Sequence, residues 1–413
     1  MNKRIYLCLA HMSGNEQKYI QEAFDTNWVV PLGPNVNGFE DDLKQFVGQD
    51  KQVVALSAGT AAVHLALIAC GVQAGNEVCV QSFTFCASSH PIKYLGATPV
   101  FIDSEKDSWN MDSALLEQAI LDRKAKTGKY PKAIIPVALY GMPYHIHEIL
   151  AIADKYGIPV IEDAAEGFGS RYEGQVLGTF GKYGVLSFNG NKMITTSGGG
   201  ALICPDEAAK QKVMWYATQA REAYPYYQHE AIGYNYRMSN ICAGIGRGQM
   251  TVVNDHIRHH KHIATLYEKA FAEIDGITFH KNPAKEYDSN YWLNTILLDP
   301  ALRIVGQEHA YEVAVQGAVG GAAGVTHQAA TLRTNCQPND NVEALRMYLD
   351  KANIESRPLW KPMHKQPVYK DAPAYVNGVS EALFKVGMCL PSGPMVSDED
   401  VAYIVENIKK AIR

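Results

Sequence analysis

The sequence predicts an α/β protein with a mainly parallel central sheet, helices on both faces, and a smaller C-terminal α+β domain. Short apolar runs of strand type alternate with helical segments between about residues 50 and 205, which is typical of a parallel sheet. Beyond about residue 250, the strand and helix segments no longer alternate in this way. A chain of 413 residues is too long for one small core, so we expect two domains, 1–250 and 251–413.

The composition is that of a globular protein, with 47% apolar and 20% charged residues. A net charge of −5 argues against a nucleic-acid-binding protein, which needs a basic surface. No apolar run approaches the roughly 20 residues of a membrane span, and the N-terminal run is too short for a signal peptide. The eight dispersed cysteines form no C-x-x-C pair and are expected to be free thiols. We expect a cytoplasmic protein without a membrane partner.

The first half of the chain supplies the expected sheet. After a first strand or arm at the N-terminus, helices are expected at 14–24 and 36–46. Strands are expected at 53–56, 77–80, 98–103, 133–137 and 159–163. The helices between them are expected at 61–70, up to 94, at 112–125 and up to 156.

The second half begins with a helix after Asp206, a plausible N-cap, and an aromatic loop between residues 223 and 240. One long helix, from about Ile241 to Ala272, is expected to lead into the second domain. There the pattern predicts strands near 278–280, 292–298 and 354–357, and helices near 308–318, 341–351 and 399–412. The low-complexity stretch Gly317–Gly324 predicts a loose loop.

A single lysine, Lys192, lies in a short polar loop between two apolar runs. Its neighbours are mostly small donors and acceptors, and a lysine kept partly dry can act as a nucleophile toward a carbonyl. Other polar or aromatic residues also follow predicted strands: Ser57, Phe85, Tyr140 and Asp163. Because ligands of parallel sheets collect at the carboxyl ends of the strands, we expect these residues to converge on one site.

Asp163 and Lys192 together suggest pyridoxal phosphate, with the lysine as the Schiff-base amine and the carboxylate as partner of the protonated ring nitrogen. Asp163 alone is equally well explained as a helix N-cap. The turn before the helix at 61–70 would bind the phosphate through Gly59 and Thr60, with a hydroxyl from Ser187.

Two further side chains fit the cofactor ring. Phe85 would stack on it, although a lone aromatic residue after a strand belongs more often to the core. Glu166 would bind the ring hydroxyl.

The histidines suggest a metal site at first sight. The pair His145 and His147 has no cysteine or carboxylate trio beside it. A second group lies among positive charges, which oppose a bound cation. It consists of His256, His259, His260 and His262. A solvated helix face is the better interpretation, and no metal is expected.

Five motifs resemble a known family, the DegT-type sugar-nucleotide aminotransferases, which are fold type I pyridoxal phosphate enzymes. They are Ser57–Leu67, Phe83–Phe85, Ile161–Glu166, Ser187–Lys192 and Gly233–Asn240. The resemblance extends over nearly the whole chain. It implies a homodimer with two shared sites, in which Asn235 reaches the neighbouring subunit's cofactor phosphate and Arg237 lies near the same site.

Three segments resemble one branch of this family, the one making UDP-4-amino-4,6-dideoxy-N-acetylglucosamine on the N-acetylbacillosamine route. They are Asn189–Gly200, Glu355–His364 and Cys389–Gly393. Much of the family has His-Pro-Thr-Lys at the lysine loop, where this chain has Asn-Gly-Asn-Lys. In this branch Trp360, Lys361 and His364 would face the nucleotide sugar.

The resemblance implies transfer of an amino group from L-glutamate to the C4 ketone of a UDP-2-acetamido-2,6-dideoxy-4-keto-hexose, for surface glycan synthesis. A 3-keto sugar, or a dTDP- or GDP-linked one, is an alternative substrate. A keto-sugar dehydratase is a second class, although the kind we know has histidine in place of the lysine. A cofactor-bound regulator without turnover is a third class, but no residues are left over for a further module.

Overall fold

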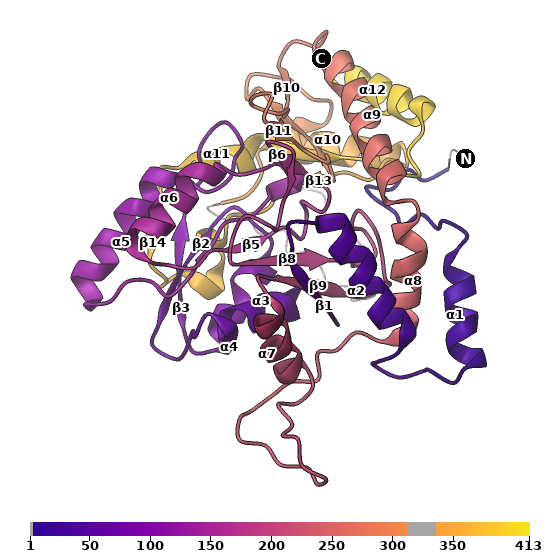
Figure 1. Ribbon diagram of the computed structural model, residues 1–413. Helices are drawn as coiled ribbons and strands as arrows, with labels where there is room; N and C mark the ends of the chain where they lie inside the picture. Colours follow the sequence, from indigo (N-terminus) through magenta and orange to yellow (C-terminus); the bar gives the residue numbers. More distant parts are fainter. Residues whose placement is uncertain (1–2, 312–335) are drawn as a thin grey trace.

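The computed structural model describes residues 3–311 and 336–413, and Figure 1 shows a central sheet with helices on both sides. The sheet has two halves joined by parallel bridges, Ile134 to Val160 and Val137 to Asp163. One half, in spatial order, is β14 (Ala374–Tyr375), β3 (Thr98–Ile102), β2 (Glu77–Gln81) and β4 (Ile134–Ile135). The other is β5 (Ile161–Asp163), β8 (Tyr183–Ser187), β9 (Gly200–Cys204) and β1 (Gln52–Leu56). Only β9 runs against its neighbours, so the sheet is mainly parallel, as predicted.

The helices in and around this sheet match the predicted segments closely. They are α1 (Glu16–Asp25), α2 (Pro34–Val47), α3 (Gly59–Ala69), α4 (His90–Tyr94), α5 (Ser113–Thr127), α6 (Ile146–Tyr156) and α7 (Glu207–Ala217). Local chemistry explains several ends. The Asp206 side chain accepts a hydrogen bond from the N–H of Ala209 and so caps α7, as predicted. Asp112 caps α5 in the same way, and Gly128 ends that helix in a left-handed conformation.

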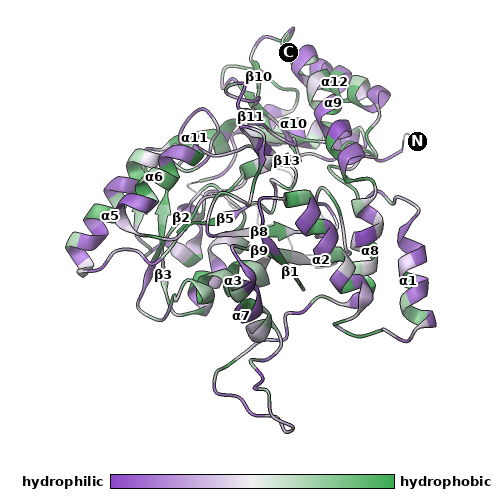
Figure 2. Cartoon of the chain, viewed as in Figure 1, coloured by the Kyte–Doolittle hydropathy of each residue, from purple (hydrophilic) through white to green (hydrophobic). Residues whose placement is uncertain are grey.

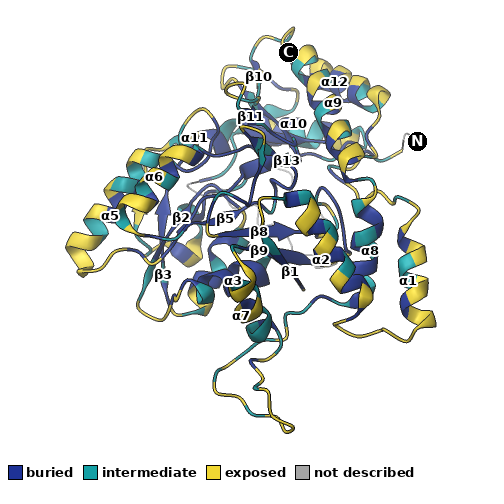
Figure 3. Cartoon of the chain, in the orientation of Figure 1, coloured by how far each residue is buried: buried dark blue, intermediate teal, exposed yellow. Residues whose placement is uncertain are grey.

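Two hydrophobic cores lie on opposite faces of the sheet because successive strand residues point to opposite sides. Val53 packs with residues of α2, α5 and α6, whereas its neighbour Val54 packs with residues of α3 and α7. Figure 3 shows the resulting distribution, with buried strands inside and exposed residues along the outer helices. Figure 2 shows hydrophilic stretches on α5 and α9, which also contribute apolar residues to the cores.

A third core forms around an antiparallel sheet in the C-terminal part of the chain. Its strands, in spatial order, are β10 (Ile277–Phe279), β12 (Asn294–Leu298), β15 (Gly387–Leu390) and β13 (Arg357–Pro358). The later helices of the chain are α8 (Asn240–Met250), α9 (Val253–Phe271), α10 (Asp340–Lys351), α11 (Val379–Val386) and α12 (Asp398–Ala411), of which α9, α10 and α12 contribute to this core. A small sheet of β11 (Tyr287–Asp288), β6 (Arg171–Tyr172) and β7 (Gln175–Val176) links the two parts of the chain.

The N-terminal segment is an arm that reaches this C-terminal core. Ile5 is buried there, its N–H donates to the carbonyl of Asn353, and its carbonyl accepts from the N–H of Glu355. The domain boundary expected between residues 250 and 251 therefore stays a prediction, because the N-terminal arm packs in the C-terminal core.

The single long helix expected at 241–272 is wrong. It is two helices, α8 and α9, because Val252 between them lies outside helical geometry (φ −123°, ψ 6°). Three glycines, Gly244, Gly246 and Gly248, bring α8 close to α1 and α2; a Cβ at Gly246 would lie 2.7 Å from the ring of Phe39.

Two other expectations concern the segment around residues 308–324 and the absence of a membrane span. Within the described residues, the expected helix at 308–318 is only a short 3-10 turn, Gln307–His309. Most of the range 308–318 lies outside the described residues, and so does the expected loop Gly317–Gly324. In the part of the chain that the structure describes, no helix combines the length and apolarity of a membrane span.

Two leucines of α5 test the assignment of the core. Leu116 is fully buried, and Leu121 on the same helix is 49% exposed. Leu116→Ala should lower the free energy of unfolding by about 2–5 kcal/mol, because it leaves a cavity. Leu121→Ala should change it by less than about 0.5 kcal/mol. Urea unfolding followed by circular dichroism measures both, and equal losses would show that α5 packs differently.

Candidate active site

A cavity of about 320 Å³ lies at the carboxyl edge of the central sheet. Loops that follow β1, β2, β5 and β8 line it, and eight of the predicted catalytic and cofactor-binding residues meet there. They are Ser57, Gly59, Thr60, Phe85, Asp163, Glu166, Ser187 and Lys192. A larger depression of about 700 Å³ lies at the opposite edge, around Cys70 and Lys182, and contains none of them. We assign the site to the smaller cavity because the ionisable residues converge there.

The Lys192 amine projects into this cavity from a tight loop after β8. The loop is closed by the Lys192 N–H, which donates to the Asn189 carbonyl at 3.0 Å. The amine Nζ lies 3.8 Å from Oε1 of Glu166 and 3.8 Å from the ring centroid of Trp292. Only 14% of the Lys192 side chain is exposed, so the amine is largely shielded from water.

Asp163 ends β5 and is held from two sides. The Ser88 hydroxyl donates to Oδ2 at 2.6 Å, and the Ala165 N–H donates to Oδ1 at 3.2 Å. Burial raises the pKa of this carboxyl, while the two hydrogen bonds and the Lys192 charge act in the opposite direction. The alternative of a helix N-cap is wrong, because β6 is the next element and no helix follows Asp163.

The N-terminus of α3 faces the cavity through Gly59 and Thr60. The N-cap residue of α3 is Ala58, whose side chain cannot accept a hydrogen bond. The first N–H groups of the helix therefore have no acceptor on the cap side chain. A Cβ at Gly59 would lie 3.0 Å from the Cβ of Ser187, so glycine lets the Ser187 hydroxyl lie against the helix start. This arrangement fits a phosphate group.

Glu166 is a second buried carboxylate, fixed by the backbone. The Tyr140 N–H donates to its Oε2 at 2.7 Å, and Tyr140 itself has a left-handed conformation (φ +54°). Burial raises the pKa of Glu166, and the nearby Lys192 charge lowers it. A strained residue that aims its N–H at this carboxylate indicates that the position of Glu166 matters.

Phe85 lies at the mouth of the cavity. Its side chain is 48% exposed, and its ring centroid is 5.4 Å from that of Trp360. The alternative that Phe85 belongs to the core is wrong.

Known proteins resemble this chain along its whole length. The family model of the DegT/DnrJ/EryC1/StrS aminotransferases matches residues 10–313 and 307–409. The chain belongs to this family. EpsN of Bacillus subtilis (strain 168), to which a pyridoxal phosphate-dependent aminotransferase activity is ascribed, is 45% identical over 98% of this chain and 95% of its own. A GDP-perosamine synthase of Escherichia coli O157:H7 is 34% identical over 97% of this chain and 96% of its own.

Solved structures agree with this membership. A DegT/DnrJ/EryC1/StrS aminotransferase from Brucella abortus superposes with a TM-score of 0.81 at 27% identity, covering 96% of this chain and 95% of that one. Spr1654 of Streptococcus pneumoniae, named as a sugar aminotransferase and solved in its PLP form, has the same fold, with a TM-score of 0.83 at 24% identity, covering 99% and 98%. The predicted α/β fold, the aminotransferase class and the pyridoxal phosphate cofactor are thereby confirmed.

Four of the residues predicted to bind the cofactor or the substrate do not line the cavity. The Arg237 guanidinium is buried, paired with Glu40 and bonded to the Ala55 carbonyl at 2.9 Å, so within this chain it stabilises the fold. The Nδ1 of His364 lies 2.7 Å from the Ser82 hydroxyl, and burial lowers the pKa of that imidazole. Asn235 and Lys361 are also outside the lining. Among the substrate residues, only Trp360 lines the cavity.

Among the cavity residues that sequence reasoning missed, two contact its charged groups. Ser88 orients Asp163, and Trp292 lies beneath the lysine. Ser88 carries a weak signal, because it follows β2 as Phe85 does. Trp292 comes from the segment before β12, far along the chain, and nothing in its local pattern points to the cavity.

The histidine helix is not the solvated face that the sequence predicts. His256 and His260 of α9 are buried, whereas His262 is exposed. The rings of His256 and His260 bond to the carbonyls of Met193 and Tyr291, which neighbour the lysine and Trp292 in sequence. These two histidines therefore support the back of the site.

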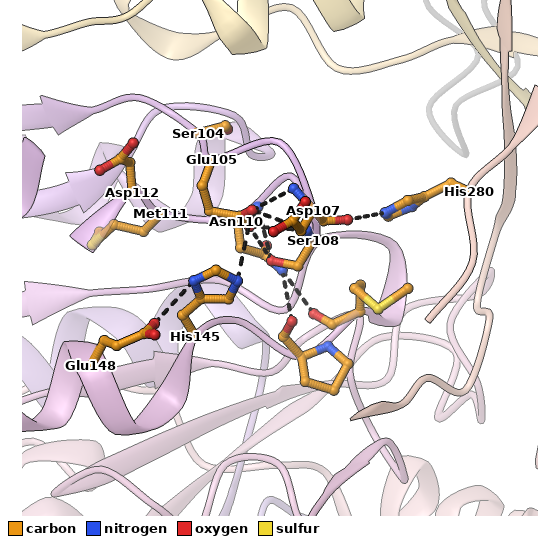
Figure 4. A network of polar contacts seen from close by, with 12 residues as sticks. Ser104, Glu105, Asp107, Ser108, Asn110, Met111, Asp112, His145, Glu148 and His280 are labelled. Carbon is orange, nitrogen blue, oxygen red and sulfur yellow. Dashed lines mark hydrogen bonds and ion pairs between the residues drawn. The ribbon is translucent and has the colours of Figure 1, made fainter. Parts of the chain in front are cut away.

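Of the other histidine pair, His145 belongs to the polar network shown in Figure 4, whereas His147 lies 3.0 Å from Glu173. Ligand-type atoms of Glu105, Asp107 and His145 lie within 4.8 Å of one another. The Glu105 carboxylate already accepts from the N–H groups of Ser108 and Asn110, and the His145 ring lies 3.0 Å from Glu148. These contacts fold the loop between β3 and α5.

Acid should destabilise the protein through His260. Burial lowers the pKa of His260 from 6.5 to about 3. As the pH falls below 6.5, the unfolded chain binds a proton that the folded protein excludes, so the stability is full above pH 6.5 and is lost below it. Between pH 7 and 5 this costs about 2 kcal/mol.

His260→Gln should remove that part of the loss in urea unfolding at the two pH values. His262→Gln, at the surface, is the control and should keep the wild-type pH dependence. An unchanged slope in the His260 variant would contradict the assignment.

Proposed function

We propose that this enzyme transfers an amino group from L-glutamate to the C4 ketone of a UDP-2-acetamido-2,6-dideoxy-4-keto-hexose, in the synthesis of a bacterial surface polysaccharide. The observation that carries the proposal is the Lys192 amine facing two buried carboxylates at the sheet edge. Relatives named for sugar nucleotides and polysaccharides support the substrate class. They include a UDP-2-acetamido-2-deoxy-3-oxo-D-glucuronate aminotransferase of Pseudomonas aeruginosa, 34% identical over 59% of this chain, and SpsC, a spore coat polysaccharide biosynthesis protein of Bacillus subtilis, 28% identical over 96%.

Each cavity residue has a task in this proposal. Bound pyridoxal phosphate supplies an aldehyde that exchanges amines and a protonated ring that accepts electrons. Lys192 would hold the cofactor through its amine and, once free, would move a proton at the donor Cα. Asp163, oriented by Ser88, keeps the ring nitrogen protonated. The start of α3 and Ser187 bind the phosphate, Glu166 accepts from the ring hydroxyl, and Phe85 covers the ring.

A second copy of the chain would complete the site. Apolar side chains are exposed between α1 and α2 and in the loop between α7 and α8, which Figure 1 shows extending away from the body. They include Val29 at 48%, Leu32 at 53%, Tyr227 at 77% and Ile232 at 84% exposure. Exposed apolar residues in such number mark an interaction surface. Asn235, at the end of this loop and outside its own cavity, would reach the cofactor phosphate of the neighbouring subunit.

Borohydride reduction of the holoenzyme tests the role of Lys192. The cofactor should be trapped on the peptide that contains Lys192, as measured by mass spectrometry. Lys192→Ala should lose about 10²–10⁴-fold in activity, because it removes the base that moves the proton. Lys182→Ala, at the other edge of the sheet, should keep wild-type activity. Trapping on any other residue would contradict the proposal.

A panel of nucleotide 4-keto and 3-keto sugars, carrying UDP, GDP or dTDP, tests the substrate. With L-glutamate, the UDP-linked 2-acetamido-4-keto sugar should give the fastest turnover and a product in which nitrogen replaces the C4 oxygen. Product mass and NMR give the answer. Reaction of 3-keto sugars alone, or loss of oxygen without gain of nitrogen, would favour the alternative substrates or the dehydratase.

A further inference from the structure

We propose that Trp292 is a positioning residue whose indole face holds the Lys192 ammonium whenever the amine is not bonded to the cofactor. The inference rests on the proposed role of Lys192 and adds a residue to the same site. Transamination frees the lysine during each half of the cycle, so the freed side chain needs a defined position near the reacting carbon.

The ammonium lies over the ring and has little else to bind. Lys192 Nζ is 3.8 Å from the Trp292 centroid, well within the range of a cation–π contact. The nearest ion-pair oxygen found in the described residues, Oε1 of Glu166, is also 3.8 Å away, beyond hydrogen-bond length. The indole is 1% exposed and the lysine side chain 14%, so the contact is largely shielded from water, where such contacts are strongest.

The indole is fixed in this position from both ends. Its Nε1–H donates to the Asn191 carbonyl at 2.6 Å, which joins the ring to the residue preceding the lysine. Its backbone N–H donates to Oδ1 of Asn290 at 2.8 Å, and the amide of Asn290 donates to the carbonyls of Glu166 and Phe168. The ring therefore keeps one position relative to both the lysine loop and the segment that carries Glu166.

The contact suits an amine that must bind and leave repeatedly. A direct hydrogen-bonded ion pair would hold the ammonium more tightly and would oppose its return to the cofactor. A cation–π contact is weaker, corresponding to about 2- to 30-fold in an equilibrium constant. It favours every state in which Lys192 is free and does nothing for the state in which Lys192 is bonded to the cofactor.

This difference gives a thermodynamic test that does not depend on turnover. Pyridoxal phosphate takes Lys192 away from the ring when it binds, whereas pyridoxamine phosphate has no aldehyde and leaves Lys192 free. Loss of the ring face should therefore strengthen the binding of pyridoxal phosphate relative to that of pyridoxamine phosphate. A residue that only fills space would weaken the binding of both compounds by the same factor.

The experiment measures the dissociation constants of both compounds with cofactor-free wild type, Trp292→Phe and Trp292→Leu. Both variants lose the bond to Asn191, but only the phenylalanine keeps a ring. The ratio of the pyridoxamine phosphate constant to the pyridoxal phosphate constant should rise by about 2- to 30-fold in Trp292→Leu and less in Trp292→Phe. Should the leucine variant fail to fold, a rise in Trp292→Phe alone supports the proposal.

Trp109→Leu is the matched control. Trp109 is equally buried but stacks on His280, outside the cavity, and its replacement should leave the ratio unchanged. An unchanged ratio in the folded Trp292 variants, or equal weakening of both compounds, would overturn the inference. Borohydride trapping in the wild type separates this outcome from failure of the proposed function, because that trapping does not require Trp292.

Discussion

The site depends on burying opposite charges together at the end of a sheet. Asp163 and Glu166 are both buried, and burial by itself favours their neutral forms. Hydrogen bonds from Ser88, Ala165 and Tyr140, together with the Lys192 ammonium, offset that cost. Isolated buried charges would be too expensive, so these carboxylates and this amine are stable only as a set. The loops around the cavity exist to supply those partners.

Much of the fold could be predicted because it follows from periodicity. The strands of the central sheet are buried on both faces, with successive residues in two different cores, and such strands appear in the sequence as short, continuous apolar runs between helical segments. The convergence of Ser57, Phe85, Asp163 and Lys192 follows from one rule, that parallel strands end at a common edge. Local sequence patterns were sufficient to predict the strands, the helices and the edge of the sheet at which the site lies.

The features that could not be predicted depend on contacts between segments that are far apart in the sequence. The ion pair of Arg237 with Glu40 could not be predicted, because the two residues are 197 positions apart in the sequence and no local pattern shows such a pair. His256 and His260 lie among charged neighbours in sequence, yet tertiary packing buries them. Val252 leaves helical geometry between α8 and α9, where α8 packs closely on α1 and α2, and Trp292 reaches the lysine from the segment before β12. Each of these outcomes is decided by contacts between distant segments.

The arm that carries Ile5 has a consequence for how the protein is made. Its backbone partners, Asn353 and Glu355, are translated only after most of the chain has left the ribosome. The arm therefore cannot form these hydrogen bonds until about 350 further residues have been synthesised. Closing so long a loop costs chain entropy, which the growing polypeptide cannot recover early. The C-terminal core, to which Ile5 belongs, can therefore be completed only late in synthesis.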